Sequence, residues 1–435
     1  MKKKLIDLIL KIKSKKITIG IVGLGYVGLP LALRFAEVGF NVIGYDKDKK
    51  KTIKLKKFES YIKSISDKEL NKKNFLPTSN LKVFSKSDVI IICLPTPLKK
   101  NSKVPDMIFL KNFAFSLKSF LRENHIIILE STTYPGTTKE IFLPIIKNSG
   151  LIPGKNVFLI YSPEREDPGN KNHQIKDIPK IVSGYSDNCK RLGSLIYGRV
   201  AKKTVEVNSL EHAEMVKLYE NIYRSINIGL ANEMKIVCDK MNLNIFEIIK
   251  AASTKPFGFS PFYPGPGYGG HCIPIDPFYL SWKSKKFGYN PRFIELSGKV
   301  NSSMPLYVKK NIKKALNKVK KKTYKILILG IAYKKNVDDL RESPAIQLIN
   351  ILEKEKNFQI NFYDPFIKKI ESRNKEFKGV NYFNLKYNKL KKFDLVTILT
   401  DHDKLNYKKI LKHSNLIIDC RGRYYNIESK KIIQS

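Results

Sequence analysis

The chain has 435 residues, with 81 lysine and arginine residues against 39 acidic ones and a formal net charge of +42. A chain of this length can bury two or three hydrophobic cores, which excludes a small scaffold held together by disulfides. The charge raises the hypothesis of binding to nucleic acid or to a membrane surface, because clustered cations release counterions from a polyanion. The lysines are spread along the whole chain, however, which favours a solvated surface without a specific nucleic-acid partner.

The cysteines and the N-terminus indicate the compartment. The five cysteines, at positions 93, 189, 238, 272 and 420, form no CxxC pair and no His/Cys cluster, so we expect reduced thiols and no metal site. The basic N-terminus resembles a signal peptide, but its apolar stretch Leu5–Leu10 is short and contains Asp7. No run approaches the ~20 apolar residues that span a bilayer. We therefore expect a soluble, cytoplasmic protein without membrane insertion.

The predicted elements form three segments. The first alternates helical stretches with buried strands at Ile17–Val22, Asn41–Tyr45, Asp88–Leu94 and Ile126–Leu129. The second contains one long helix from about Ser209 to Met241, followed by a loop dense in Gly, Pro and aromatic residues at Lys255–Pro277. The third returns to strands, at Lys325–Leu329, Gln359–Tyr363, Leu395–Leu399 and Leu416–Asp419. We predict an α/β protein with two Rossmann-like, doubly wound parallel-sheet domains, residues 1–207 and 313–435, joined by a central helical domain, residues 208–312.

A glycine-rich turn follows the first predicted strand. Gly23, Gly25 and Gly28 form a GxGxxG pattern between this strand and a helix with Pro30 in its first turn. The first glycine permits the tight turn, the second lets a pyrophosphate approach the backbone, and the third lets helix and strand pack closely. Asp46 ends the second strand, where a carboxylate binds a ribose hydroxyl and repels a 2′-phosphate. The pattern predicts a dinucleotide site that prefers NAD to NADP.

The loop Tyr268–Pro277 (YGGHCIPIDP) carries a candidate nucleophile. A single cysteine is usually an inert, buried thiol. Here two glycines allow a ligand to approach the backbone closely, and Cys272 is followed four residues later by Asp276. This pattern is typical of an exposed nucleophile.

The predicted long helix carries a polar stripe. Lys217, Asn221 and Arg224 are spaced i, i+4 and i+7 and therefore share one face. Two cations and an amide on one face fit either a solvated surface or a site that binds an anion.

These motifs, in this order, resemble the UDP-glucose/GDP-mannose dehydrogenase family over nearly the whole chain. Further matching motifs are Leu94-Pro95-Thr96-Pro97, Glu130-Ser131-Thr132, Ser162-Pro163-Glu164-Arg165, Ala213-Glu214, Tyr333-Lys334 and Asp339-Leu340-Arg341-Glu342-Ser343. The resemblance implies an N-terminal NAD domain, a central dimerisation domain and a C-terminal nucleotide-sugar domain, in a homodimer or a larger homo-oligomer. The stretch GGHCIPID is a further family motif. Within the family, SPEREDPGN and KPFGFSPFYPGPGYGGHCIPIDPFYL resemble the branch acting on UDP-N-acetylhexosamines, and most of all the UDP-N-acetylglucosamine 6-dehydrogenases. Pro168 stands where members acting on UDP-glucose have a second acid, so the role of that acid is not carried over.

The resemblance implies oxidation of C6 of a nucleotide sugar from alcohol to carboxylate in two steps. A covalent nucleophile keeps the intermediate aldehyde bound while NAD is used twice. Cys272 would form a thiohemiacetal and then a thioester, and a cation such as Lys217 would favour its thiolate. The other implied catalytic roles are oxyanion stabilisation by Lys217 and Asn221, positioning of Lys217 or the attacking water by Asp276, and activation of that water by Glu164 with Thr132.

The expected ligand contacts follow the same resemblance. Besides the three glycines and Asp46, the residues expected at NAD are Tyr26, Val27, Lys51, Thr96, Thr132 and Arg341. Those expected at the UDP-sugar are Glu164, Arg165, Lys217, Asn221, Arg224, Phe262, Tyr263, Gly269, Tyr333 and Lys334. Lys334 and Arg341 match family positions that contact nucleotide phosphates, which fixed cations bind well.

Several hypotheses on the function remain open. UDP-GlcNAc is the first candidate substrate, for polysaccharide biosynthesis, with UDP-GalNAc, UDP-ManNAc and UDP-glucose as alternatives. The two epimers differ from it in the direction of one hydroxyl or acetamido group, and the sequence does not show the contacts that discriminate them. A two-electron dehydrogenase of the hydroxyacid type would share the first domain but would need no cysteine. A basic nucleic-acid or nucleotide-binding protein would use the dinucleotide site for regulation only.

Overall fold

The computed structural model describes residues 2–63, 65–100, 102–166, 174–270, 272–317, 319, 321–370, 377 and 379–435. The chain forms two compact units, which we call the N-terminal unit (Met1–Glu220 and Phe278–Tyr289) and the C-terminal unit (Asn221–Pro277 and Asn290–Ser435). Helices α8 (Leu210–Lys240) and α10 (Asp276–Lys285) each contribute residues to both units.

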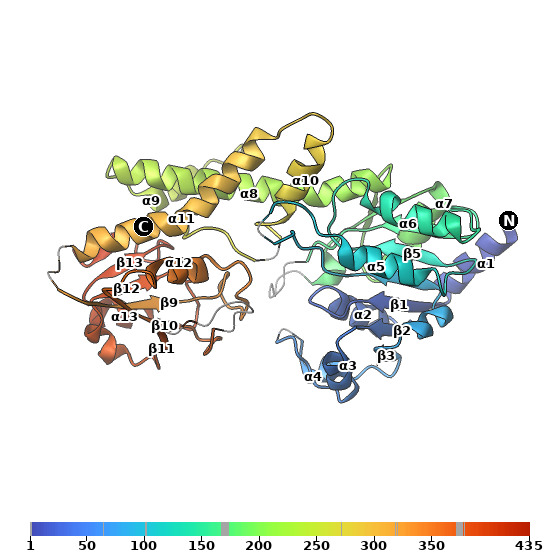
Figure 1. Cartoon of the computed structure of the whole chain (residues 1–435), viewed down its shortest axis with the longest axis horizontal. Helices are drawn as coiled ribbons and strands as arrows, with labels where there is room; N and C mark the ends of the chain where they lie inside the picture. Colours follow the sequence, from blue (N-terminus) through green and yellow to red (C-terminus); the bar gives the residue numbers. More distant parts are fainter. Residues whose placement is uncertain are drawn as a thin grey trace. The chain divides into compact units, whose positions relative to one another are not determined.

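The N-terminal unit is built on one sheet (Figure 1). Among its described residues, eight strands lie in the order β3-β2-β1-β4-β5-β6-β7-β8. Neighbouring strands are parallel except β6 and β7, so β7 and β8 run opposite to the others. The strands are β1 (Thr18–Val22), β2 (Asn41–Tyr45), β3 (Phe75–Thr78), β4 (Val89–Ile92), β5 (Ile126–Leu129), β6 (Phe158–Tyr161), β7 (Lys180–Gly184) and β8 (Thr204–Glu206).

Helices cover this sheet because its central strands are apolar on both faces. On one face, alternate strand residues such as Ile19, Ile21 and Ile126 share a core with Phe35 and Leu192 from two of the helices. The helices are α1 (Lys2–Lys13), α2 (Gly28–Glu37), α3 (Lys49–Lys56), α4 (Asp67–Leu70), α5 (Ile108–Leu117), α6 (Thr137–Asn148) and α7 (Asp187–Tyr197), with the 3₁₀ segments η1 (Leu81–Lys86) and η2 (Ile175–Asp177).

Helix α8 is fixed to the N-terminal unit through Glu214, whose side chain is fully buried. Its carboxylate accepts the backbone N–H groups of Gly136 at 2.5 Å and Thr138 at 2.8 Å, at the start of α6. Gly136 occupies the N-cap position and has no side chain to cap the helix, so Glu214 supplies the missing acceptor. Burial raises the pKa of Glu214 to about 7, although these hydrogen bonds oppose the shift.

The C-terminal unit has a second sheet. Among its described residues, six strands lie in the order β11-β10-β9-β12-β13-β14, and every neighbouring pair is parallel. The strands are β9 (Tyr324–Leu329), β10 (Phe358–Tyr363), β11 (Val380–Tyr382), β12 (Leu395–Ile398), β13 (Ile417–Asp419) and β14 (Ile432–Gln434). The other elements of this unit are α9 (Ile245–Ala252), α11 (Arg292–Leu316), α12 (Pro344–Leu352), α13 (Tyr407–His413) and η3 (Tyr387–Lys392).

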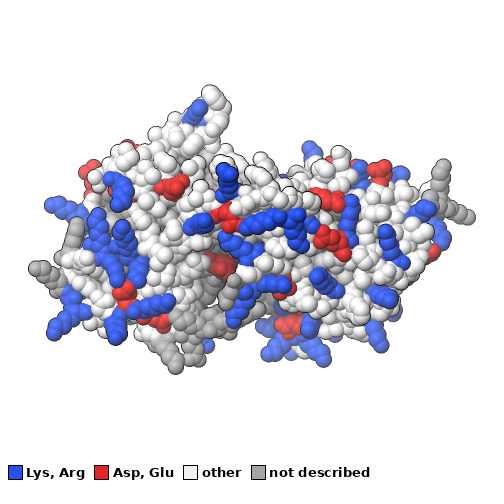
Figure 2. Space-filling model, turned by 45° about the horizontal axis from the view of Figure 1, so that its top comes forward, with Lys and Arg blue, Asp and Glu red and all other residues white. Residues whose placement is uncertain are grey.

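The predicted fold class is confirmed. Two strands of the first sheet have the predicted bounds, Asn41–Tyr45 and Ile126–Leu129, and the predicted long helix differs from α8 by one residue at each end. The antiparallel pair β6–β7 was not expected from the sequence. In the part of the chain that the structure describes, no helix is both long and apolar enough to cross a bilayer. Lysine and arginine side chains are scattered over the face shown in Figure 2, with acidic side chains between them.

Candidate active site

The turn after β1 leaves room for a ligand at one of its three glycines. Gly23 has a left-handed backbone with φ of 93°. A Cβ atom on Gly28 would lie 1.9 Å from the carbonyl oxygen of Gly23, so α2 can pack against this turn only with glycine there. A Cβ atom on Gly25 would meet nothing within 4 Å. Two glycines therefore serve packing, and the backbone of Gly25 faces open space.

Polar groups surround this turn where β1 and β4 lie side by side. Asp46 is 9% exposed, and its Oδ2 atom accepts the N–H of Leu24 at 3.1 Å and pairs with the Nζ atom of Lys51 at 3.0 Å. Thr96 donates its hydroxyl to the carbonyl of Thr132 at 2.7 Å. The strand order reverses between β1 and β4, and this is where doubly wound sheets bind dinucleotides. The open backbone, the carboxylate and the N-terminus of α2 fit NAD.

A buried lysine connects two strands of the same sheet to Glu164. The Nζ atom of Lys180 lies 2.9 Å from Oε2 of Glu164 and 3.1 Å from Oε1 of Glu130, and the side chains are 3%, 12% and 0% exposed, respectively. The hydroxyl of Tyr197 donates to Glu130 at 2.5 Å. The other oxygen of Glu164 accepts the backbone N–H groups of Arg165 and Glu166, each at 2.6 Å. Both oxygens of Glu164 are thus engaged with donors.

The negative charge of this cluster is unevenly shared. Burial raises the pKa of Glu164, but Lys180 and the N–H of Glu166 outweigh burial, and the pKa ends below its ordinary value. Lys217 on α8 lowers it further. Burial raises the pKa of Glu130 to about 7 against the pull of Lys180, and burial with repulsion from Glu164 raises that of Glu166 to about 8. Of the two acids that pair with Lys180, Glu164 is therefore the more fully ionised at neutral pH.

The arginine that follows Glu164 is also held in place. Arg165 donates to the carbonyl of Pro179 at 2.8 Å and forms an ion pair with Glu220 of α8 at 2.6 Å. Pro168, which bears on the choice between family branches, lies outside the described residues.

Cys272 differs from the other four cysteines. It is exposed, whereas Cys189, Cys238 and Cys420 are buried and Cys93 is partly buried. Its carbonyl accepts the N–H groups of Ile275 at 3.1 Å and Asp276 at 2.8 Å, so Cys272 begins the helical turn that continues into α10. The positive end of a helix favours a thiolate.

Beside this turn, two predicted site residues are bonded to each other. Asn221 donates its side-chain amide to Oδ2 of Asp276 at 2.6 Å, and both residues are buried. Because this bond fixes the orientation of the amide, Asp276 positions Asn221 in the C-terminal unit.

A separate pocket of about 230 Å³ lies within the C-terminal unit. Five predicted substrate residues line it: Arg224, Tyr263, Gly269, Tyr333 and Lys334. Three charged residues absent from the prediction also line it: Lys335, Asp401 and Arg421. Four cations against one carboxylate make the pocket suitable for a polyanion such as a diphosphate.

The glycine loop that forms one wall is fixed from behind. The buried amide of Asn232 accepts the N–H of Gly265 at 2.9 Å and donates to Asn301 at 2.8 Å. A Cβ atom on Gly269 would lie 2.8 Å from the Cβ atom of Tyr333, so this loop packs closely against the turn after β9. The chain after β9, β12 and β13 supplies the opposite wall, at the carboxyl edge of the sheet.

Two predicted contacts lie elsewhere in the C-terminal unit. Phe262 is not among the pocket residues, and its ring packs against that of Tyr223 at 5.8 Å. Arg341 pairs with Asp339, with nitrogen–oxygen distances of 2.6 to 3.0 Å. Their predicted roles stay predictions.

Two functional candidates were missed by the sequence analysis although each left a signal. Lys180 is a charged residue at the start of an apolar strand, and Arg421 closely follows the carboxyl end of a parallel strand. Such positions are typical of a buried ion pair and of a ligand contact, respectively.

Comparison with known proteins gives a consistent result. Residues 17–201, 211–303 and 327–426 match the NAD binding, central and UDP binding domains of the UDP-glucose/GDP-mannose dehydrogenase family. The chain belongs to this family. The expectation of an NAD-dependent nucleotide-sugar dehydrogenase is confirmed by this match and by the relatives.

Family relatives at similar identity carry different substrate names. The chain is 34% identical to a UDP-N-acetyl-D-mannosamine dehydrogenase of Methanocaldococcus jannaschii over 91% of this chain and 92% of that one. It is 35% identical to a UDP-N-acetyl-D-glucosamine 6-dehydrogenase of Pseudomonas aeruginosa over 81% and 84%. The solved UDP-D-ManNAc dehydrogenase of Pyrococcus horikoshii is 30% identical, with a TM-score of 0.84 over 96% of this chain and 97% of that one.

Two glycine substitutions separate cofactor binding from folding in this family member. We expect Gly25→Ala to fold normally, because its methyl group meets open space, and to weaken NAD binding by roughly tenfold or more, because the methyl group occupies the ligand's approach. Gly28→Ala should instead destabilise the fold through contact with the Gly23 carbonyl. Calorimetric titration with NAD and urea unfolding measure the two effects. Wild-type NAD affinity in Gly25→Ala would contradict the assignment.

Proposed function

We propose that this dehydrogenase performs a four-electron oxidation of a UDP-N-acetylhexosamine at C6, which yields the uronic acid for polysaccharide biosynthesis. The proposal depends above all on one observation: Cys272 is exposed on the turn that starts α10, next to the Asn221–Asp276 pair. An alcohol dehydrogenase that stops at the aldehyde needs no such thiol.

The proposed role of Cys272 follows from the need to oxidise twice without losing an aldehyde. The turn that contains Gly25, together with Asp46, would hold NAD, which would supply the acceptor for the hydride that leaves C6 in each oxidation. After the first, the thiolate adds to the aldehyde carbon and forms a thiohemiacetal. After the second, C6 is a thioester, and attack by water releases the carboxylate and returns the thiolate.

The chain's polar groups stabilise the charges of these steps. Addition of sulfur and of water each places negative charge on the C6 oxygen, and we assign Lys217 and the Asn221 amide as its donors. Asp276 orients that amide through their 2.6 Å hydrogen bond. We assign activation of the water to Glu164, assisted by Thr132, because Lys180 keeps this carboxylate ionised and therefore able to accept a proton.

The cationic pocket of the C-terminal unit is the proposed site for the UDP part of the substrate. Arg224, Lys334, Lys335 and Arg421 provide the positive charge that two phosphates require. Tyr263 and Tyr333 add aromatic surface for the uridine or the sugar.

The identity of the sugar is the most specific part of the proposal. UDP-GlcNAc is our first candidate because of the SPEREDPGN and KPFGFSPFYPGPGYGGHCIPIDPFYL stretches. UDP-ManNAc is supported equally by relatives of 34% identity. UDP-GalNAc and UDP-glucose complete the set to be tested.

We further propose a homodimer formed through α8, which buries polar residues on one side and exposes apolar residues on the other. At about 100° per residue, its buried polar residues fall on one side: Glu214, Lys217, Asn221, Ser225, Asn232 and Lys235. Its exposed apolar residues fall on the other: Met215, Tyr219, Tyr223, Leu230, Met234 and Val237, each 38 to 67% exposed. A helix with an apolar outer face is stable in water when another surface covers that face, and a second copy of α8 offers a matching one.

The decisive test of the activity is the yield of NADH per sugar. We expect about two NADH per UDP-GlcNAc or UDP-ManNAc consumed, because two hydrides leave C6. Cys272→Ser should lose at least about 100-fold in overall turnover, since a serine hydroxyl is not ionised at neutral pH and an alkoxide is a poorer leaving group than a thiolate. A stoichiometry of one NADH, or turnover of hydroxyacids only, would support the two-electron alternative. Salt-sensitive DNA binding without turnover would support the nucleic-acid alternative.

The Lys180 cluster predicts a change in pH dependence. In Lys180→Met the pKa of Glu164 should rise, because burial is no longer balanced by the ammonium group. The acidic limb of the kcat profile should therefore move to higher pH, while Lys180→Arg, which keeps the cation, should retain the original limb. Urea unfolding at each pH checks that both variants are folded. An unchanged limb in the methionine variant would show that Glu164 is not the base.

The dimer is tested by placing a charge on the exposed apolar face of α8. Leu230→Asp should weaken self-association by roughly 100-fold or more in sedimentation velocity, because it buries an unpaired carboxylate. Phe115→Asp on α5, where the side chain is 75% exposed, is the matched control and should leave association unchanged. Equal behaviour of the two variants would place the interface elsewhere.

A further inference from the structure

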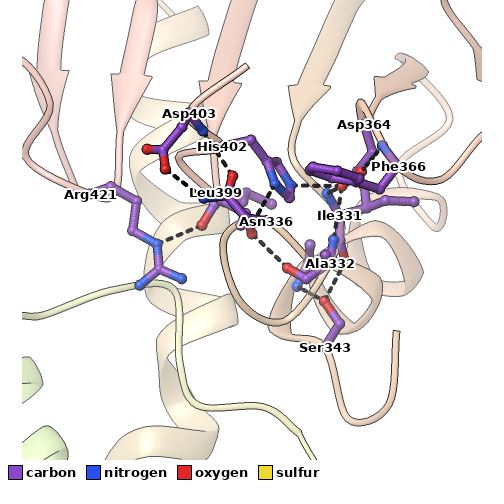
Figure 3. A network of polar contacts seen from close by, with 12 residues as sticks. Ile331, Ala332, Asn336, Ser343, Asp364, Phe366, Leu399, His402, Asp403 and Arg421 are labelled. Atoms are coloured by element: carbon purple, nitrogen blue, oxygen red, sulfur yellow. Dashed lines mark hydrogen bonds and ion pairs between the residues drawn. The ribbon is translucent and has the colours of Figure 1, made fainter. Parts of the chain in front are cut away.

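A fully buried histidine lies between the two turns that form one wall of the UDP pocket (Figure 3). His402 follows β12, and its Nε2 atom is 3.0 Å from Oδ2 of Asp364, at the end of β10. Its Nδ1 atom is 3.0 Å from the backbone nitrogen of Asn336, in the turn after β9. One imidazole ring thus joins three successive positions along the carboxyl edge of the sheet.

The chemistry of its two neighbours fixes which nitrogen carries the proton. A backbone N–H can only donate, so Nδ1 of His402 must be the unprotonated acceptor. Nε2 is then the N–H that donates to Asp364. The same Asp364 oxygen also accepts the N–H groups of Ile331 at 2.9 Å and Ala332 at 3.1 Å, so its orientation is determined by the turn as well as by the ring.

The turn that receives this bond needs external support. Asn336 has a left-handed backbone with φ of 62°, which costs energy for any residue with a side chain. Its side chain exchanges two hydrogen bonds with Asp403, one from the amide to the carboxylate and one from the N–H of Asp403 at 3.1 Å. The hydroxyl of Thr400 adds a bond to the carbonyl of Ala332 at 2.6 Å.

The supported turn carries cations of the pocket. Lys334 and Lys335 directly precede Asn336, and both line the pocket together with Asp401, the neighbour of His402. Arg421, from the next strand, donates to the carbonyl of Leu399 at 2.8 Å and so depends on the same connection after β12. The positions of three of the four pocket cations are therefore linked to the segment that contains His402.

We infer that His402 is a positioning residue for nucleotide binding: its Nδ1 atom holds the Asn336 N–H, and with it the Lys334–Lys335 turn, in the conformation that receives the diphosphate. The inference rests on the proposed UDP pocket. It assigns His402 no contact with the substrate, so its effect is on affinity for the nucleotide rather than on the chemical steps.

Two variants of the full-length enzyme test the two hydrogen bonds of the His402 ring separately. His402→Asn can place an amide oxygen near the Nδ1 position and keep the acceptor for Asn336. His402→Gln can place its amide nitrogen near the Nε2 position and keep the donor to Asp364 while it loses that acceptor. We expect UDP to bind His402→Gln roughly three- to tenfold more weakly than wild type, the fold-change of one ordinary hydrogen bond, and His402→Asn within about twofold of wild type.

Calorimetric titration measures the affinity of each variant for UDP alone and, separately, for NAD. Weaker UDP binding confined to His402→Gln, with unchanged NAD affinity and urea midpoint, supports the inference. Wild-type UDP affinity in His402→Gln, or equal losses in the two variants, overturns it. Lys334→Met reports on the pocket itself: if it and the wild-type enzyme bind UDP equally, or if the wild-type enzyme does not bind UDP, the proposed function fails and the inference with it.

Discussion

Both sheets depend on the same constraint, a tight turn after the first strand whose backbone N–H is held by an acid at the end of the second strand. In the N-terminal unit Asp46 accepts the N–H of Leu24, and in the C-terminal unit Asp364 accepts those of Ile331 and Ala332. The glycine before each turn is required for close packing, because a Cβ atom on Gly330 would lie 2.2 Å from the carbonyl oxygen of Thr400. The strand order of each sheet reverses beside this turn, which opens the space for a ligand.

The carboxylates of Asp46 and Asp364 differ in whether a ligand can reach them. This difference separates the NAD-binding sheet from the sheet proposed to bind UDP. Asp46 is paired with Lys51, whose side chain is 35% exposed. Asp364 is 1% exposed and is covered by His402, so no ribose hydroxyl can reach it. The Asp364 carboxylate is thus not accessible for the ribose contact that the corresponding carboxylate makes in a dinucleotide site. In the proposed function, the ligand of this sheet is instead held by cations of the pocket, on turns that contact Asp364 and His402.

The fold was predictable from the sequence because its information is local. Continuous apolar runs located β2 and β5, and the long uninterrupted helical pattern located α8, without knowledge of any distant contact. Side-chain partners were not predictable in this way. Lys180 meets Glu130 and Glu164 only when three strands have assembled, and Asn221 meets Asp276 across 55 positions of sequence. Periodicity reports which face a residue occupies and contains no information on which distant residue faces it. Helical spacing and the loop pattern singled out Asn221 and Asp276, and the resemblance to a family supplied their roles, whereas Lys180, Arg421 and His402 belonged to no quoted motif.

The exposed apolar side of α8 connects the proposed assembly to the proposed chemistry. The polar face is buried because Glu214 must reach the start of α6 and Asn221 must reach Asp276, and these bonds leave the helix no freedom to rotate about its axis. The apolar residues are consequently held outward, at a cost in water that a partner surface removes. Association through this face then stabilises the same helix orientation that holds Lys217 and Asn221 inward. In the proposed dimer, the partner therefore contributes to the order of the active site.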